Sequence, residues 1–372
     1  MILAWRNLSH DRLRFFVTII GIAFAVFLMI FQGSLLTGFI RASSIVIDAT
    51  EADLWITGRG VPSFDYGTAL PRRFREMAFG VPGVGAVERV VTGYAVWQKP
   101  SGKRQVILLV GAEPSVGARF PLPRLGDHAD VTQPESVVID RSAASLFEVA
   151  TVPLEIEISQ RRARVSEMVE GFGTFLGNPY VFTGYDDAAR YLGLEPEETR
   201  FLLVRVAPDN NILAVQQSLR SRLPEADVWT REEFARRSQQ FWVIQTGAGG
   251  AILVAGVLGF IVGLVVVSQN IYATTMEHIE EFSTLKALGA SRRYIQQIVL
   301  LQALVSGVIG SLIGMLAAFP AVEAIRGYIS WIHTPWWLPT GMIVTGLVMC
   351  GLASVATIRK AVAVEPARVF RA

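Results

Sequence analysis

Four long apolar stretches without a single Asp, Glu, Lys or Arg dominate the hydrophobic pattern of the chain. They span residues 15–40, 238–276, 294–322 and 327–358. A bilayer core of about 30 Å needs about 20 apolar residues in a helix, and each stretch is long enough. The first is also longer than the apolar region of a signal peptide, which has about 7–15 residues. The pattern therefore predicts four transmembrane helices, the first of them an uncleaved anchor.

Between the first and second apolar stretches, apolar and polar residues alternate over short distances, as they do in the strands and helices of a folded domain. Residues 85–114 predict a β-hairpin, because two runs rich in Val, Tyr and Trp flank a Pro-Ser-Gly turn. Residues 200–230 read strand, amphipathic helix and strand, and residues 153–171 alternate as a second hairpin in a second subdomain. This order indicates an α+β module. The predicted fold class is therefore an α-helical membrane protein with four transmembrane helices plus an α+β extracytoplasmic (periplasmic) domain between helices 1 and 2.

A helix is predicted to connect this domain to the second span. It begins at Thr230, with Glu233 three residues later, the signature of a capping box. We expect it to run straight towards the span, with Trp242 marking the membrane interface where the span begins. Such a helix could transmit motion, or it could serve packing alone.

Charge fixes the expected orientation. Only 18% of the residues are charged, against about 25% in a typical soluble domain. Outside residues 41–243, the basic residues are Arg6, Arg12, Arg14, Lys286, Arg292, Arg293, Arg326, Arg359, Lys360, Arg368 and Arg371. All but Arg326 face the cytoplasm if both termini do, as the positive-inside rule requires. We therefore predict a multi-pass protein of the bacterial inner (cytoplasmic) membrane.

The predicted organisation follows from these two patterns. In chain order it is a cytoplasmic N-terminal segment (1–14), the first span (15–40), the periplasmic domain (41–240), the second span (241–271), a cytoplasmic coupling segment (272–293), the third span (294–322), a short periplasmic turn (323–336), the fourth span (337–358) and a cytoplasmic tail (359–372).

Catalytic and metal motifs are missing from the sequence. The "SGKR" at residues 101–104 lacks the glycine spacing and the Ser/Thr of a phosphate-binding loop. The four histidines are scattered, and the one cysteine, Cys350, lies in the last span, so no metal-ligand spacing arises. We predict no enzyme, no metal site, no cofactor and no nucleic-acid partner for this chain.

Small residues recur within two of the spans. Gly259 and Gly263 in the second span, and Gly310 and Gly314 in the third, form GxxxG patterns that let helix backbones approach closely. These glycines are candidates either for packing within one subunit or for contacts between two subunits.

The segment between the second and third apolar stretches has the pattern of a closed helical unit. Its apolar stripe is Ile279, Phe282, Leu285 and Leu288, flanked by Glu277, Glu280, Glu281 and Lys286. Gly289 is placed to end this helix in a left-handed conformation, and Ser291 to cap the next one. Arg292 and Arg293 then oppose the dipole of that next helix, so we attribute them to topology or partner binding. The stripe either packs on the chain's own span ends or enters a groove on another protein.

The same segment carries a family resemblance. "EFSTLKALGASRRYI", followed by a glycine-punctuated span and by the ending "RKAVAVEPARVFRA", resembles permeases of the FtsX/MacB superfamily of ABC transporters. "AWRNLSHDRLRFFVTIIGIAFAVFLMIFQ", "ADLWI" and "GFIVGLVVVSQNIYATTMEHIEEFSTLKALGA" resemble the DevC type, permeases of heterocyst-type exporters. Ser283 stands where the family often has Gly, a mild departure from the pattern.

The resemblance implies a permease that lacks its own ATPase domain. It would work as a homodimer with two copies of an ABC ATP-binding subunit, which binds ATP and Mg, and with a periplasmic adaptor (membrane fusion protein) and an outer-membrane channel. ATP-driven motion of the spans would be relayed to the periplasmic domain (mechanotransmission). Phe282, Leu285 and Leu288 would contact the ATPase, and Glu281 and Lys286 would orient it. The alternatives are an FtsX-like regulator of a periplasmic cell-wall hydrolase and a lipoprotein-releasing permease.

Overall fold

The computed structural model describes residues 12–114, 122, 133–195, 198–277, 284 and 288–362. The chain divides into two compact units. The membrane unit comprises Met1–Gly38, Gly250–Arg326 and Ile332–Ala372, and the outer domain comprises Phe39–Gly249 and Gly327–Trp331. The N-terminal segment up to residue 11 and the last ten residues of the predicted tail lie outside the described residues.

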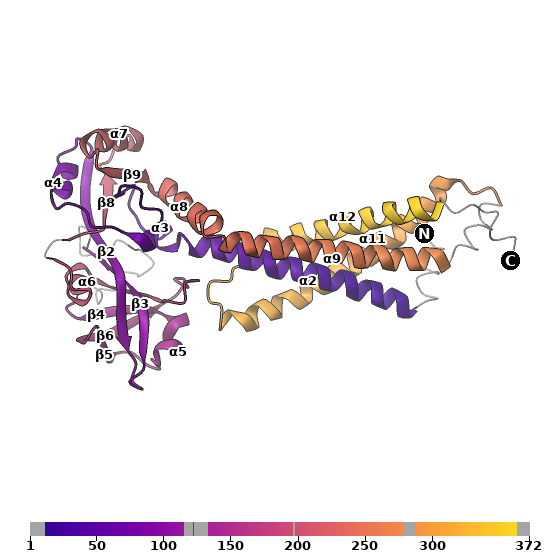
Figure 1. Cartoon of the computed structure of the whole chain (residues 1–372), viewed down its shortest axis with the longest axis horizontal. Coiled ribbons are helices and arrows are strands. Elements are labelled where there is room, and N and C mark those ends of the chain that lie inside the picture. The colour runs from indigo at the N-terminus through magenta and orange to yellow at the C-terminus, as the bar shows by residue number, and fades with distance from the viewer. Residues whose placement is uncertain are drawn as a thin grey trace. The chain divides into compact units, whose positions relative to one another are not determined.

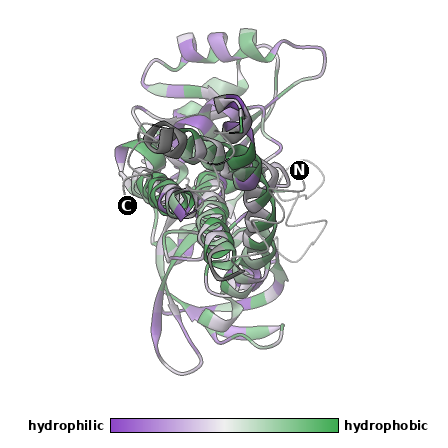
Figure 2. Cartoon of the chain, turned by 90° about the vertical axis from the view of Figure 1, so that its right-hand side faces the viewer, coloured by the Kyte–Doolittle hydropathy of each residue, from purple (hydrophilic) through white to green (hydrophobic). Residues whose placement is uncertain are grey.

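Four long helices carry the membrane-spanning stretches: α2 (Arg12–Ala42), α9 (Ala248–Glu277), α11 (Arg292–Arg326) and α12 (Trp337–Val362). Each is long and apolar enough to cross a membrane (Figure 1). Figure 2 shows much of the helical ribbon in the green of hydrophobic residues. Ile22, Val26 and Ile30 of α2 pack with Val267 of α9 and Met349 of α12 in the core of the membrane unit. The predicted fold class is confirmed.

Helix α9 begins later than the start predicted for the second span. The stretch from Phe241 to Gln245 forms a π-helix, and α9 starts only at Ala248, after Gly247 with a φ of 75°. The expected straight helix from the domain into the span is therefore wrong, because a left-handed glycine interrupts it. The other three apolar helical segments begin at Phe15, Gln296 and Trp337, and the boundaries of the spans in the membrane stay predictions.

One half of the outer domain is a split α/β sheet. Its elements are β1 (Leu54–Gly58), α4 (Arg73–Phe79), the first part of β2 (Val84–Gln98), β8 (Phe201–Val206), α7 (Ile212–Arg222) and β9 (Ala226–Thr230). The strands lie in the order β2-β8-β1-β9, all antiparallel. Both faces of β1 are buried, because Leu54 and Ile56 pack towards α4 and α7 while Trp55 packs into a second cluster.

The other half is a small barrel formed by the second part of β2 together with β3 (Arg104–Ala112), β7 (Tyr180–Gly184), β4 (Ser136–Asp140), β6 (Arg161–Val169) and β5 (Leu154–Ile158). The ring closes because β3 pairs with both β2 and β7, and β2 also pairs with β5. Trp97 stacks on Phe147 inside it, with ring centroids 4.3 Å apart. Two short helices, α5 (Ala144–Phe147) and α6 (Tyr185–Leu192), complete the half.

The local predictions for this domain are confirmed. Residues 85–114 form the β2–β3 hairpin, and residues 153–171 form the β5–β6 hairpin within the barrel. The strand, helix and strand of residues 200–230 are β8, α7 and β9. The α+β module therefore has the two subdomains expected from its sequence, joined by β2.

Candidate functional site

The described part of the coupling segment has the predicted termination. Gly289 has a φ of 92°, in the left-handed region, and the amide of Leu288 donates to the Thr284 carbonyl at 3.0 Å. The Ser291 hydroxyl accepts from the Tyr294 amide at 3.3 Å, so it caps α11, which starts at Arg292. One helical unit ends and another begins within a few residues, as the sequence predicted.

Leu288 is the one residue of the apolar stripe that the structure describes. Its side chain is 81% exposed, so it has almost no hydrophobic partner among the described residues. Glu277 ends α9, and Arg293 lies in the first turn of α11. The predicted contact residues Glu281, Phe282, Leu285 and Lys286 lie outside the described residues, as does the side chain of Arg292. Their role in ATPase binding stays a prediction.

Three of the four spaced glycines contact other helices of the same membrane unit. A Cβ at Gly263 would lie 2.5 Å from Ala25 Cβ, one at Gly310 would lie 2.7 Å from Ile22 Cβ, and one at Gly314 would lie 2.4 Å from the Ala23 carbonyl oxygen. Such distances are too short for any side chain. A Cβ at Gly259 would approach only Leu28, at 3.9 Å. The close packing against α2 occurs within one subunit, and a dimer contact stays a prediction.

The link from the outer domain to α9 consists of α8 (Arg231–Gln240) and the π-helix that follows it. The predicted capping box is confirmed: the Thr230 hydroxyl accepts from the Glu233 amide, and the Glu233 carboxylate accepts from the Thr230 amide. Ser238 donates to the Ser43 carbonyl at 2.5 Å, just beyond the end of α2. Within the outer domain, the start of the second-span segment is thus tied to the end of the first.

Trp242 is buried in the outer domain and precedes the start of α9. Its indole Nε1 donates to the Asp65 carboxylate at 3.1 Å, and the Tyr180 hydroxyl donates to the other Asp65 oxygen at 3.0 Å. Burial raises the pKa of Asp65 above its ordinary value, although these hydrogen bonds work in the opposite direction. Hydropathy alone predicts the Trp242 indole at the lipid headgroups, but in the structure it donates a hydrogen bond to a buried carboxylate.

Four aromatic rings, which we call the entry cluster, connect three chain segments that lead to spans. Phe39 lies at the end of α2, Trp242 precedes α9, Trp331 lies in the turn between α11 and α12, and Phe175 comes from a barrel loop. The Phe175 centroid is 4.5 Å from Phe39 and 4.9 Å from Trp242, and Phe39 is 6.1 Å from Trp331. One barrel residue thus contacts rings from two of the three entering segments.

A parallel set of contacts occurs inside the membrane unit. The Ser34 hydroxyl lies 2.8 Å from the Thr334 hydroxyl, and the Thr37 hydroxyl donates to the His333 carbonyl at 2.7 Å. The amide of His333 donates to the Ser34 carbonyl at 3.3 Å. These hydrogen bonds fasten α2 to the chain that enters α12.

Sequence reasoning did not find the entry cluster or the buried Asp65. Phe39 lies in the predicted first span, Trp331 in the predicted periplasmic turn, and Phe175 in a Gly-rich loop without periodicity. The only available signal was the capping box, which showed that a helix leads from the domain towards the span. Among the described residues there is no group of three or more His, Cys, Asp or Glu side chains that could hold a metal ion.

Comparison with known proteins identifies the class. The family model described as the MacB-like periplasmic core domain matches residues 15–222, more than half of the chain, and the model of the FtsX-like permease C-terminal domain matches residues 240–366. The protein is therefore a multi-pass membrane permease. It belongs to the FtsX/MacB family of ABC transporter permeases.

Full-length relatives agree with this assignment. Two uncharacterized ABC transporter permeases of Mycobacterium tuberculosis are 23% identical over 376 residues and 24% identical over 383 residues. Both alignments cover 99% of this chain and 98% of the relative. The DevC-type resemblance is not tested by these relatives and stays a prediction.

Two solved structures are each similar to about half of the chain. The periplasmic region of MacB from Actinobacillus actinomycetemcomitans is 13% identical, with a TM-score of 0.36, and covers 51% of this chain and 94% of its own. The extracellular domain of the ABC-type transporter YknZ from Gram-positive bacteria is also 13% identical, with a TM-score of 0.32, covering 48% and 99%.

Proposed function

We propose that this permease couples ATP hydrolysis by a separate ABC ATP-binding subunit to a conformational change of the outer domain. Two copies of the chain would work with two copies of the ATPase, which binds ATP and Mg. The termini and residues 277–293 face the cytoplasm of an inner membrane in this proposal. The outer domain then acts on a periplasmic adaptor, which leads to an outer-membrane channel and so drives export.

The entry cluster is the observation that carries this proposal. Segments adjoining α2, α9 and the α11–α12 turn all end in one aromatic cluster around Phe175. A displacement of any one of these segments therefore acts on the same barrel loop. Packed aromatic rings transmit displacement well, because protein interiors are close-packed and resist compression.

The cytoplasmic end supports the same proposal. Leu288 is highly exposed beside a left-handed glycine, in a segment that resembles the ATPase-coupling segment of the family. An exposed leucine gains roughly 1.5–3 kcal/mol when a partner covers it fully. We therefore expect it to enter a groove of the ATPase together with Phe282 and Leu285.

Two variants test the two ends separately in the full-length protein. Leu288→Asp should abolish co-purification with the ATP-binding subunit, whereas Leu213→Asp, at a leucine of α7 that is also mostly exposed, should not. Phe175→Ala should retain the ATPase but lose the ATP-dependent fluorescence change of a probe attached through Lys103→Cys in a Cys350→Ala background. The exposed turn variant Tyr328→Ala serves as its control. An unchanged signal in Phe175→Ala would overturn the proposed relay.

A further inference from the structure

A cavity of about 720 Å³ lies on the outer domain between α4 and the middle of β2. Its volume falls within the range of about 300–1,000 Å³ that is typical of small-molecule sites. Four arginines line it, Arg72, Arg73, Arg75 and Arg89, and Glu76 is the one acidic lining residue. No part of the proposed coupling mechanism uses this cavity.

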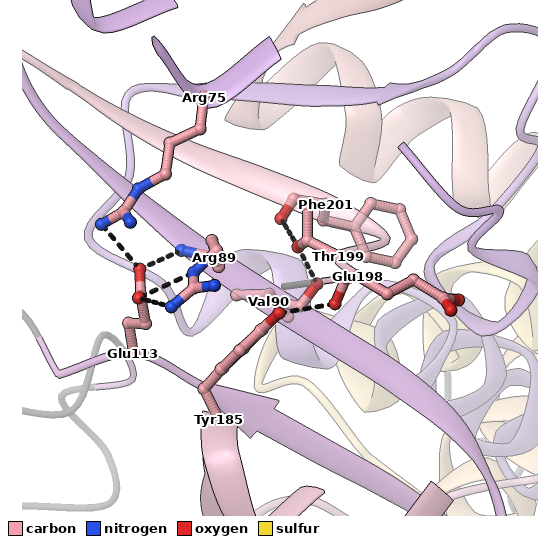
Figure 3. Close-up of polar contacts among 8 residues, drawn as sticks. All are labelled: Arg75, Arg89, Val90, Glu113, Tyr185, Glu198, Thr199 and Phe201. Atoms are coloured by element: carbon pink, nitrogen blue, oxygen red, sulfur yellow. Dashed lines mark hydrogen bonds and ion pairs between the residues drawn. The ribbon is translucent and has the colours of Figure 1, made fainter. Parts of the chain in front are cut away.

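The floor of the cavity is held in place by a buried carboxylate. Glu113 accepts from the backbone amide of Arg89 at 3.0 Å and from its Nε at 2.7 Å, and it also pairs with Arg75 Nη2 at 3.1 Å (Figure 3). The guanidinium of Arg89 lies over the ring of Tyr185, 4.1 Å from its centroid. Burial lowers the pKa of Arg89, but Glu113 outweighs it, so the pKa is raised and the charge is retained.

One carboxylate cannot satisfy two guanidinium groups. Each guanidinium has five N–H donors in a rigid fork, whereas a carboxylate offers two acceptor oxygens. Arg89 and Glu113 are mostly buried, with side chains 16% and 17% exposed, and Arg75 is 45% exposed at the cavity wall. Two cations thus converge on one anion, and the more exposed of them retains donor capacity towards the cavity.

The other lining residues include both a charged side chain and apolar side chains. Arg73 pairs with Glu225 at 2.8 Å, but both side chains are more than half exposed, so this pair is weak and exchanges easily. Phe79 and Val87 supply apolar lining. The site therefore offers several forked cations beside a small hydrophobic surface.

We propose that this cavity binds a phosphate group, with Arg75 and Arg89 as its principal ligands and Arg72 and Arg73 at its entrance. Phosphate suits the site better than a second carboxylate, because its additional oxygens and larger charge match two guanidinium forks at once. The group is carried by a soluble phosphate compound or by a lipid headgroup whose first methylenes contact Phe79. Arg75 comes from α4 and Arg89 from the first part of β2, so both principal ligands belong to the split-sheet half of the outer domain.

Calorimetric titration of the full-length protein in detergent with inorganic phosphate tests the site. We expect Arg75→Gln to weaken binding by about tenfold or more. The matched control is Arg162→Gln, which removes an equally charged side chain from an exposed ion pair with Glu155 on the barrel. Absence of binding, or equal losses in both variants, would overturn the proposal.

A gain-of-binding variant separates the site from effects on folding. Glu113→Gln removes the competing negative charge but keeps a side-chain oxygen that can accept from Arg89. We expect phosphate to bind several-fold more tightly, a result that a misfolded protein cannot give. Weaker binding in a folded Glu113→Gln protein would contradict the proposal. Dihexanoyl phosphatidic acid, compared with inorganic phosphate, then identifies the source. Tighter lipid binding that Phe79→Ser abolishes indicates a headgroup, and equal binding indicates a soluble phosphate.

Discussion

The indole nitrogen of Trp242 lies 3.1 Å from Asp65 and donates a hydrogen bond to its buried carboxylate. Tyr180 donates to the same side chain from a barrel strand. A carboxylate near the beginning of the outer domain thus holds both the barrel and the segment that leads into α9. Removing one of these donors leaves a buried carboxyl group with incomplete hydrogen bonding, which is costly.

Trp242→Phe should lower the free energy of unfolding of the outer domain by about 1–3 kcal/mol, since it leaves a buried polar group without one of its hydrogen-bond donors. Denaturant titration of the full-length protein in detergent measures the loss. Trp229→Phe is the matched control, because the Trp229 indole has no hydrogen-bond partner among the described residues. Equal losses in the two variants would show that the hydrogen bond to Asp65 contributes little.

Stability should depend on pH in a direction set by Asp65. Its pKa in the folded chain is raised above the ordinary value of 3.8, so the folded state binds the proton more tightly than the unfolded state. This contribution is present in full below pH 3.8 and is lost as the pH rises through the folded pKa. Asp65→Asn should flatten that part of the pH profile, measured as denaturation midpoints from about pH 4 to pH 8.

Glu233 should act with the opposite sign. Burial favours its neutral form, but hydrogen bonds from Thr230 and Gln216 and the charge of Arg220 outweigh this and lower its pKa below 4.5. Its contribution is therefore present above pH 4.5 and is lost as the pH falls through the lowered value. Glu233→Gln should reduce the acid sensitivity of the domain, and an acid limb identical to that of the wild type would refute this assignment.

The capping box should be worth a measurable amount on its own. Thr230→Ala should cost about 1 kcal/mol of domain stability, because the Glu233 amide loses its acceptor. Thr230→Ser keeps a hydroxyl at the same position and should retain most of this stability. Thermal unfolding of both variants checks the comparison, and equal behaviour would assign the effect to the lost methyl group.

Alanine substitutions at two glycines of the membrane unit should differ in their effect on stability. Gly314→Ala should destabilise the helix bundle, because the new methyl would lie 2.4 Å from a backbone oxygen of Ala23. Gly351→Ala should be neutral, since a Cβ there meets nothing within 4 Å. The temperature at which each variant precipitates from detergent measures the difference. Similar temperatures would mean that α2 and α11 separate readily.

Residue Gly289 should tolerate only side chains that adopt its backbone conformation. A Cβ there meets no atom within 4 Å, so any effect of substitution reports on the φ of 92°. Gly289→Asn should preserve assembly with the ATP-binding subunit, because Asn enters the left-handed region more readily than other residues. Gly289→Val should weaken assembly, as measured by co-purification. If the two variants co-purified equally well with the ATP-binding subunit, the conformation of Gly289 would not matter for binding.

Local features of this protein were predictable from its sequence. The capping box at Thr230, the left-handed Gly289 and the two hairpins each depend on residues close together in the chain, so spacing and turn chemistry reveal them. The spans were predictable in the same way, because each is a long stretch of consecutive residues without Asp, Glu, Lys or Arg. The start of α9 could not be predicted from hydropathy. An aromatic residue such as Trp242 has the same hydropathy whether it lies in a domain core or at a membrane surface.

The non-local features could not be predicted. Closure of the barrel requires the parallel pairing of β3 with β7, about 70 residues further along the chain. The arginine cavity joins Arg75, Arg89 and Thr199 across three elements. Its only trace in the sequence is the basic run at residues 72–75, which reads equally well as a solvated helix face.

The continuity of β2 limits how this domain can be divided. Val90 pairs with Ala112 of the barrel and with Phe201 of the split sheet, so the border between the halves falls inside a strand and not in a loop. A fragment cut at that border would expose unpaired backbone groups on both pieces. The two halves should consequently unfold in a single transition and resist separation by protease, and neither should be exchangeable as a module between related permeases.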